Sequence, residues 1–248
     1  RYGISNGLTF ETRGEASSRT FGAGVGLTAA LPLQMLGQVA LAGSRDDTNG
    51  TGGLYQLGLE YASLRNGFTA RTEGVTSDYR RIGQLDPTPS YRRQSLMSYT
   101  YFTRQFGQFG LAYARSESFT TTPIVTYSAN YTIVVAARAT LSFIATRVET
   151  SNGLAEGNAV GVNLLIPLDG RINATASATR RTGGTDFHVG ASKMIGEETG
   201  GGWRALAGRR GGENYGGGGG YYQGSYGQGV AGGIGAGNPS KARVGGQG

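Results

Sequence analysis

The residue types that most often carry out catalysis are scarce in this chain. It has no Cys and a single His, His188, which lies in the run Phe187-His188-Val189-Gly190. Nucleophilic catalysis needs a Ser or Cys beside a base, and a third group that orients the base. The sequence places no such groups near His188. We therefore interpret His188 as a structural residue and predict neither a catalytic residue nor an enzyme.

Metal and cofactor sites are equally unsupported by the sequence. The acidic pairs Asp46-Asp47 and Glu197-Glu198 lie far apart and have no His or Cys near them. The run Gly22-Ala23-Gly24-Val25-Gly26 has the spacing of a nucleotide-binding glycine loop, but no helical pattern follows it. Glycine at every second residue instead predicts a strand with one bare face. We predict no metal and no cofactor.

The composition favours a membrane β-barrel over a soluble two-layer fold. With 248 residues the chain has room for one large all-β domain, yet it has 46 Gly, only 38% hydrophobic residues and no Cys. A transmembrane barrel needs apolar side chains only on its lipid-facing side. No run approaches the roughly 20 apolar residues of a membrane-spanning helix. The absence of Cys leaves the cellular compartment open.

The charge pattern gives little support for nucleic-acid binding. The formal net charge is +7, with 23 Lys and Arg against 16 Asp and Glu, and Lys occurs only at Lys193 and Lys241. The arginines are scattered over predicted strand ends and turns, whereas a nucleic-acid site concentrates them on one face. We predict no nucleic-acid partner. Because the chain starts at Arg1 without Met or an apolar leader, we expect a mature form or, preferably, a fragment.

Period-two alternation is the strongest pattern along the chain. In Tyr55–Tyr61 the apolar residues fall on one side of a strand and Gln56, Gly58 and Glu60 on the other. The fold predicted is all-β, an antiparallel meander of about twelve strands that forms part of a transmembrane β-barrel. The expected strands are residues 8–16, 21–30, 38–44, 55–61, 68–76, 95–103, 108–115, 125–132, 139–146, 159–168, 172–179 and 187–193.

The alternation also predicts which side chains face water and which face lipid. Charges of both signs on one side would keep a wide lumen hydrated without selecting one sign of ion. The predicted lumen-facing residues are Glu11, Arg13, Glu15, Gln56, Glu60, Arg71, Glu73, Asn130, Asn163 and Asn173. The predicted lipid-facing or aromatic-girdle residues are Tyr55, Leu57, Leu59, Tyr61, Tyr127, Tyr131, Leu141 and Phe143.

Turn residues divide the strands into hairpins. Asn6-Gly7, Asn66-Gly67, Asn152-Gly153 and Asp169-Gly170 each stand between alternating runs and are typical of tight turns. The stretch from Asp78 to Tyr91 contains two prolines and predicts an exposed loop. Residues 1–200 are therefore assigned to the partial barrel. Residues 201–248 are assigned to a Gly-rich region with one possible strand, Trp203 to Ala207, and then a poorly ordered tail.

Several segments together resemble the translocation barrel of fimbrial outer-membrane ushers of the chaperone–usher pathway. The resemblance covers residues 1–200 and is carried by Arg1 to Glu11, Phe21 to Leu27, Tyr55 to Tyr61 and Gly161 to Gly170. It implies the part of the barrel that follows the plug, in the bacterial outer membrane. It also implies that the intact protein secretes pilus subunits, which periplasmic chaperones deliver. The implied partners are pilus subunits, chaperone–subunit complexes and outer-membrane lipid.

Three other interpretations remain open from the sequence alone. A smaller complete barrel of about twelve strands could act as a porin or transporter. A secreted Gly-rich β-structural protein would show one fixed short repeat, whereas the strand lengths here vary. A soluble β-sandwich enzyme or lectin would need more residues for a buried core and a recognisable site.

Overall fold

The computed structural model describes residues 2–81, 91–135, 138–150, 157–169, 171–195, 199–225 and 227–236, and these residues are almost entirely β-strand. The strand order within the sheet follows the chain from β1 to β16, and the paired strands are antiparallel. The only helix in the described residues is the single turn η1 (Pro32–Gln34) between β3 and β4. None of the described helical residues could therefore span a membrane.

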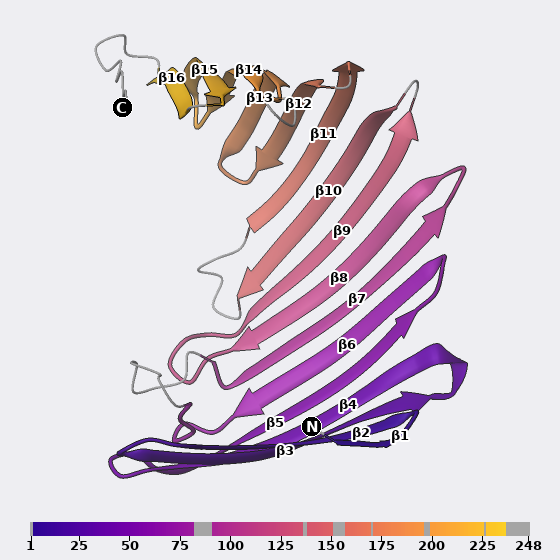
Figure 1. Ribbon diagram of the computed structural model, residues 1–248, viewed down its shortest axis with the longest axis vertical. Coiled ribbons are helices and arrows are strands. Elements are labelled where there is room, and N and C mark those ends of the chain that lie inside the picture. Colours follow the sequence, from indigo (N-terminus) through magenta and orange to yellow (C-terminus); the bar gives the residue numbers. More distant parts are fainter. Residues whose placement is uncertain are drawn as a thin grey trace. The chain divides into compact units, whose positions relative to one another are not determined.

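The strands fall into two units. Unit 1 comprises Arg1–Ala129 and Arg147–Glu156, and unit 2 comprises Asn130–Thr146 and Gly157–Gly248. Figure 1 shows β2 to β8 as neighbouring strands in unit 1 and β11 to β16 as neighbouring strands in unit 2. The strands are β1 (Tyr2–Ser5), β2 (Leu8–Ala16), β3 (Thr20–Leu31), β4 (Met35–Asp46), β5 (Gly50–Ala62), β6 (Asn66–Val75), β7 (Arg93–Thr103), β8 (Gly107–Glu117), β9 (Ile124–Val135), β10 (Ala139–Thr150), β11 (Gly157–Asp169), β12 (Ile172–Arg181), β13 (Gly184–Lys193), β14 (Gly200–Arg210), β15 (Glu213–Gly224) and β16 (Gly227–Ala236).

The predicted all-β antiparallel meander is confirmed, and each of the twelve predicted strands has a counterpart. The described residues hold sixteen strands where about twelve were expected. The four-residue strand β1 escaped prediction because so short a run shows little alternation. The possible strand at Trp203 lies inside β14, and β15 and β16 follow it.

The Gly-rich segment differs most from its prediction. Where a frayed tail was expected, Gly216 to Gly220 pair on one side with β14 and on the other with β16. Glycine has no side chain to bury, but a ladder needs only backbone N–H and C=O groups, and glycine supplies both. Residues 237–248 lie outside the described part of the chain.

The turns match their predictions in part. Asn6-Gly7 links β1 and β2, and Asp169 ends β11. Asn66-Gly67 instead forms the start of β6, and the turn before it consists of residues 63–65. The Ser63 hydroxyl accepts a hydrogen bond from the Asn66 amide at 2.9 Å and so closes this turn. Asn152-Gly153, Gly170 and the proline pair Pro87 and Pro89 lie outside the described residues.

Substitutions in β16 should show how closely its backbone approaches β15. A Cβ atom added at Gly232 would lie 2.9 Å from the Gly219 Cα and 3.1 Å from the Gly218 oxygen. We expect Gly232→Ala to destabilise the protein by about 1–3 kcal/mol through overpacking. Amide hydrogen exchange along β15 and β16 would accelerate with it.

Gly229→Ala is the matched control in the same strand, since its Cβ would meet nothing within 4 Å. Equal exchange rates in the two variants would contradict the close pairing of β15 with β16.

Candidate functional site: the polar face of the sheet

The strand register gives unit 1 two chemically different faces. Across the ladders Phe10 stands opposite Leu27, Leu27 opposite Val39, and Val39 opposite Leu57. Tyr55, Leu57, Leu59 and Tyr61 share this side, which we call the apolar face. The other side carries Gln56 and Glu60 and is called the polar face.

The predicted water-facing residues of unit 1 all lie on the polar face. Glu11, Arg13 and Glu15 stand opposite Gly26, Gly24 and Gly22, so no side chain of β3 covers them. Two further rows continue this face, with Gln56 opposite Glu73 and Gly58 opposite Arg71. The residues predicted to face a lumen, Glu11, Arg13, Glu15, Gln56, Glu60, Arg71 and Glu73, therefore share one side of the sheet.

Unit 2 separates its side chains in the same way. Val162, Leu164 and Ile166 stand opposite Ala178, Ala176 and Ala174 on one side of the sheet. On the other side Asn163 stands opposite Ser177, and Asn173 opposite Ser192. In β9 and β10 the hydroxyl of Thr132 donates to that of Ser142 at 3.1 Å, so Asn130 shares its side with this polar pair. Tyr131 stacks on Phe143, with 6.4 Å between ring centroids, and Leu141 lies on the same side.

Neither unit has the buried core of a soluble protein within the described residues. Only two hydrophobic residues there are buried, Val75 and Ala139. On the apolar face of unit 1, Leu41 is 55% exposed and Val39 and Leu57 are each 46% exposed. A contiguous exposed apolar surface of this kind marks contact with lipid or with another protein.

The boundary of the apolar face runs diagonally across the strands. One cross-strand row contains Val25, Leu41 and Tyr55 at its β3–β5 end, yet it reaches Arg93 in β7 and Glu117 in β8. In a barrel the strands tilt against the axis, so points at equal depth are displaced along successive strands. The diagonal boundary is therefore what a tilted strand crossing a membrane requires.

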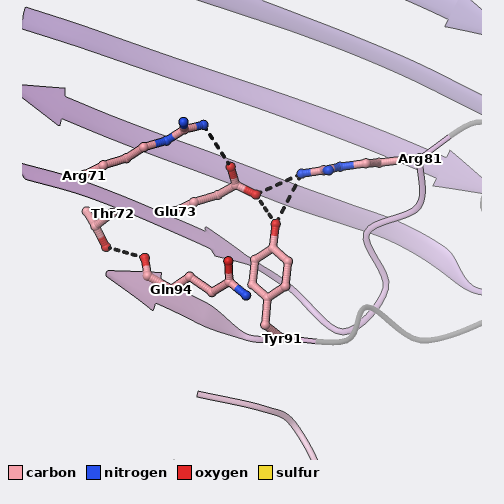
Figure 2. Close-up of polar contacts among 6 residues, drawn as sticks. All are labelled: Arg71, Thr72, Glu73, Arg81, Tyr91 and Gln94. Atoms are coloured by element: carbon pink, nitrogen blue, oxygen red, sulfur yellow. Dashed lines mark hydrogen bonds and ion pairs between the residues drawn. The ribbon is translucent and has the colours of Figure 1, made fainter. Parts of the chain in front are cut away.

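A cluster of polar contacts closes one end of the polar face, and we call it the Glu73 clasp (Figure 2). Glu73 is bound by Arg81 at 2.8 Å, and it also accepts a hydrogen bond from the phenol of Tyr91. Arg71 lies 3.8 Å from the other carboxylate oxygen. With its amide oxygen turned toward Arg71, Gln56 accepts hydrogen bonds of 3.0 and 2.7 Å from that guanidinium.

The clasp anchors a connecting segment to the polar face. Residues 76–81 leave β6, and the Arg80 amide donates to the hydroxyl of Ser44 at 2.8 Å. Gly53 in β5 and Thr76 exchange two hydrogen bonds of 2.9 Å. The predicted exposed loop from Asp78 to Tyr91 therefore departs from expectation in its described part. Tyr79 and Arg80 are half-buried, because residues 76–81 pack against Gly52 of β5, and Tyr91 is half-buried beside Glu73 and Arg81.

Both loop residues that contact Glu73 have raised pKa values. Burial raises the pKa of the Tyr91 phenol above its ordinary value of 10.0, and the hydrogen bond and charge of Glu73 raise it further. Burial lowers the pKa of Arg81, but the charge of Tyr91 once it is ionised and the charge of Glu73 outweigh that effect, and the net shift is upward. The neutral phenol and the charged guanidinium are thus the forms that this site stabilises.

In unit 2, His188 has a neighbour, Tyr215, that its sequence surroundings do not predict. The Nδ1 atom of His188 lies 3.0 Å from the Tyr215 hydroxyl, and the two rings stack at 6.3 Å. The pair spans Gly208, which separates the two residues across β14. No group of three or more metal-ligating residues occurs among the described residues. The pair is a polar contact on the polar side of unit 2. Its two members are 27 residues apart in the sequence, so residue spacing does not predict their contact.

Comparisons with known proteins identify the fold. No protein-family model and no curated protein matches the chain. The solved structure of the P pilus usher (PapC) translocation pore matches 95% of this chain and 52% of the pore chain, with 13% identity and a TM-score of 0.63. The chain therefore spans about half the length of that pore. Its fold is that of part of the β-barrel of that usher pore.

Two other outer-membrane proteins match with lower scores. A mutant Rh. blastica porin matches 87% of this chain and 84% of its own, with 15% identity and a TM-score of 0.46. A bacterial polysaccharide outer membrane secretin matches 94% of this chain and 91% of its own, with 11% identity and a TM-score of 0.39.

The packing of residues 76–81 on β5 can be tested at one glycine. A Cβ atom at Gly52 would overlap the backbone of Tyr79. We expect Gly52→Ala to displace the segment, so that limited proteolysis cleaves after Tyr79 or Arg80 much faster. Gly53→Ala is the control, because the nearest atom to its Cβ is 3.9 Å away. Similar cleavage rates in both variants would refute this packing.

The Glu73 clasp should make one tyrosine ionise late. Because folding raises the pKa of Tyr91, its contribution to stability is complete below pH 10.0 and is lost as the pH rises through the folded-state pKa. Subtracting the tyrosinate absorbance of a Tyr91→Phe variant isolates this group. Glu73→Gln should move its titration back toward 10.0, whereas Glu60→Gln, on the same face, should leave it unchanged. A titration that Glu73→Gln does not shift would refute the coupling.

Proposed function

We propose that this chain forms part of the wall of a bacterial outer-membrane secretion pore of the usher type. The observation that carries the proposal is the uncovered apolar face on strands whose other face is polar and charged. In a transmembrane barrel the first faces lipid and the second lines the lumen. The ten polar residues predicted from the sequence would line the lumen, and the eight apolar and aromatic ones would contact lipid.

The charges on the polar face support passage of a protein more than selection of an ion. Ion-selective pores concentrate charges of one sign in a ring. Here Glu and Arg alternate and pair along the strands, as in Arg13 with Glu15 and Arg71 with Glu73. A wall that carries both signs stays hydrated and does not form a ring of one charge.

The cargo in this proposal is a pilus subunit, delivered to the intact protein as a complex with a periplasmic chaperone. This part rests on the likeness to the P pilus usher pore and on the sequence resemblance of residues 1–200. The role is passage through a hydrated opening, so it requires no catalytic residue and no cofactor.

A photo-crosslinking amino acid at Gln56 or Leu57 tests the cargo directly. In cells that assemble the corresponding pilus, the residue at position 56 should crosslink to the pilus subunit during secretion, and that at position 57 should not. Subunit crosslinks at both positions, or at neither, would refute the proposed orientation of the wall.

Membrane insertion can be tested by one substitution on each face of β5. Leu57→Arg places a charge on the apolar face, where the cost near the bilayer midplane is about 2–4 kcal/mol. We expect this variant to lose most of its heat-modifiable band on a gel and to leave the outer-membrane fraction. Gln56→Arg, on the neighbouring polar face, should keep both properties. A wild-type chain that folds as a soluble monomer without detergent would refute the barrel itself.

A further inference from the structure

Arginine side chains occupy one border of the apolar face in unit 1. Arg45 lies near the end of β4, opposite Phe21 on β3. Arg93 opens β7 in the row of Leu41, and Arg115 stands in β8 in the row of Val39. In β10, Arg147 follows Leu141 and Phe143 on the same side of the strand. We call these four arginines the arginine border. Arg45, Arg93 and Arg115 step along the ladder in the same direction as the apolar band.

Arginines recur at the corresponding strand ends of unit 2. Arg180 lies near the end of β12, on the side of Ala174 and Ala176. Arg209 lies near the end of β14 and stands opposite Phe187. Both are exposed. Each unit thus places arginines on its apolar side at the end where the even-numbered strands finish.

The arginine border keeps a net positive charge although two of its arginines form ion pairs with glutamates. Arg115 pairs with Glu117 at 2.8 Å, and Arg147 pairs with Glu149 at 2.6 Å. Arg45 and Arg93 are exposed and have no ion-pair partner among the described residues. Glu117, which pairs with Arg115, also stands opposite Arg93, so four arginines face two carboxylates and an excess of two positive charges lies beside an exposed apolar surface.

The opposite end of the same face in unit 1 has a different chemistry. There the rows contain Tyr61 opposite Phe68, Phe68 opposite Tyr99, and Tyr101 opposite Phe109. Aromatic rings of this kind sit at a membrane interface without requiring charged headgroups. Arg65 and Arg104 lie in the connections at this end, but the strands of unit 1 place no arginine on the apolar face there among the described residues.

Loop lengths indicate which interface carries the arginines. At their end, unit 1 has the short turns 17–19 and 47–49 and the longer connections 76–92, 118–123 and 151–156. At the other end of unit 1, hairpins close with residues 6–7, 63–65 and 104–106. Outer-membrane barrels have short periplasmic turns and longer extracellular loops. The arginine border therefore belongs at the outer leaflet.

We propose that the arginine border binds the phosphate groups of an anionic lipid in the outer leaflet, while the adjacent apolar face contacts the acyl chains of the same lipid. This inference rests on the proposed function, since it needs the barrel to lie in a membrane. Arginine suits the task because its planar guanidinium makes paired hydrogen bonds to phosphate and is always charged.

Binding of lipid A to the full chain folded in a zwitterionic detergent tests this proposal. Arg45→Gln with Arg93→Gln removes the two unpaired guanidinium groups. Each arginine near an anionic surface is worth about fivefold in affinity, so the double variant should bind lipid A roughly 25-fold more weakly than the wild type. Its affinity for dephosphorylated lipid A should not change.

The matched control removes the same charge from the polar faces. Arg13→Gln with Arg204→Gln should keep the wild-type preference for lipid A over its dephosphorylated form. An equal loss in this control, or no preference in the wild type, would overturn the proposal. Inorganic phosphate that displaces lipid A at comparable concentration would also overturn it, because the acyl chains would then contribute nothing.

Heat-modifiability, measured on the same samples, separates the two proposals. A wild-type chain that folds in detergent but does not prefer lipid A refutes the lipid site alone. A chain without heat-modifiable structure refutes the barrel, and the lipid site with it.

Discussion

The hydrogen-bonded ladder between neighbouring antiparallel strands is the interaction on which this structure depends. Inside a bilayer no water is present to satisfy backbone N–H and C=O groups, so each group must pair within the protein. The ladder does this regardless of side chain, which is why strands as unlike as β5 and β15 continue the same pattern. Side chains are then free to serve the two environments on either side of the sheet.

This division of roles explains a composition that would be poor for a soluble protein. With Val75 and Ala139 the only buried hydrophobic residues among those described, stability cannot come from a two-layer core. Hydrophobic residues instead lie on one side, where lipid would replace the missing layer in the proposed barrel. On the other side Glu, Arg and Asn stay hydrated, and glycine opposite Arg13 or Glu15 leaves them room. The Glu73 clasp uses that same open surface to fix residues 76–81 close to β4 and β5.

The sequence predicts the parts of this fold that depend on local alternation. In Tyr55–Tyr61 the apolar residues alternate with Gln56, Gly58 and Glu60, which predicts a strand with one apolar and one polar face. β5 has these two faces. β15 and β16 escaped prediction because a run of glycines has no side chains to alternate. The contacts of Glu73 with Arg81 and Tyr91 escaped because they join a strand to the far ends of a connection. Contacts of that kind are set by the path of the backbone, which residue spacing does not encode.

Tyrosine stands directly opposite a closely covered glycine in three pairs of two ladders: Tyr55 with Gly74, Tyr215 with Gly208, and Tyr221 with Gly202. In each pair a Cβ atom on the glycine would collide with the tyrosine ring, so the ring covers the backbone of the neighbouring strand. The members of a pair therefore cannot evolve independently. A related sequence that replaces the glycine must also give up or reorient the tyrosine, and such coupled changes would reveal strand register in an alignment too divergent for ordinary sequence comparison.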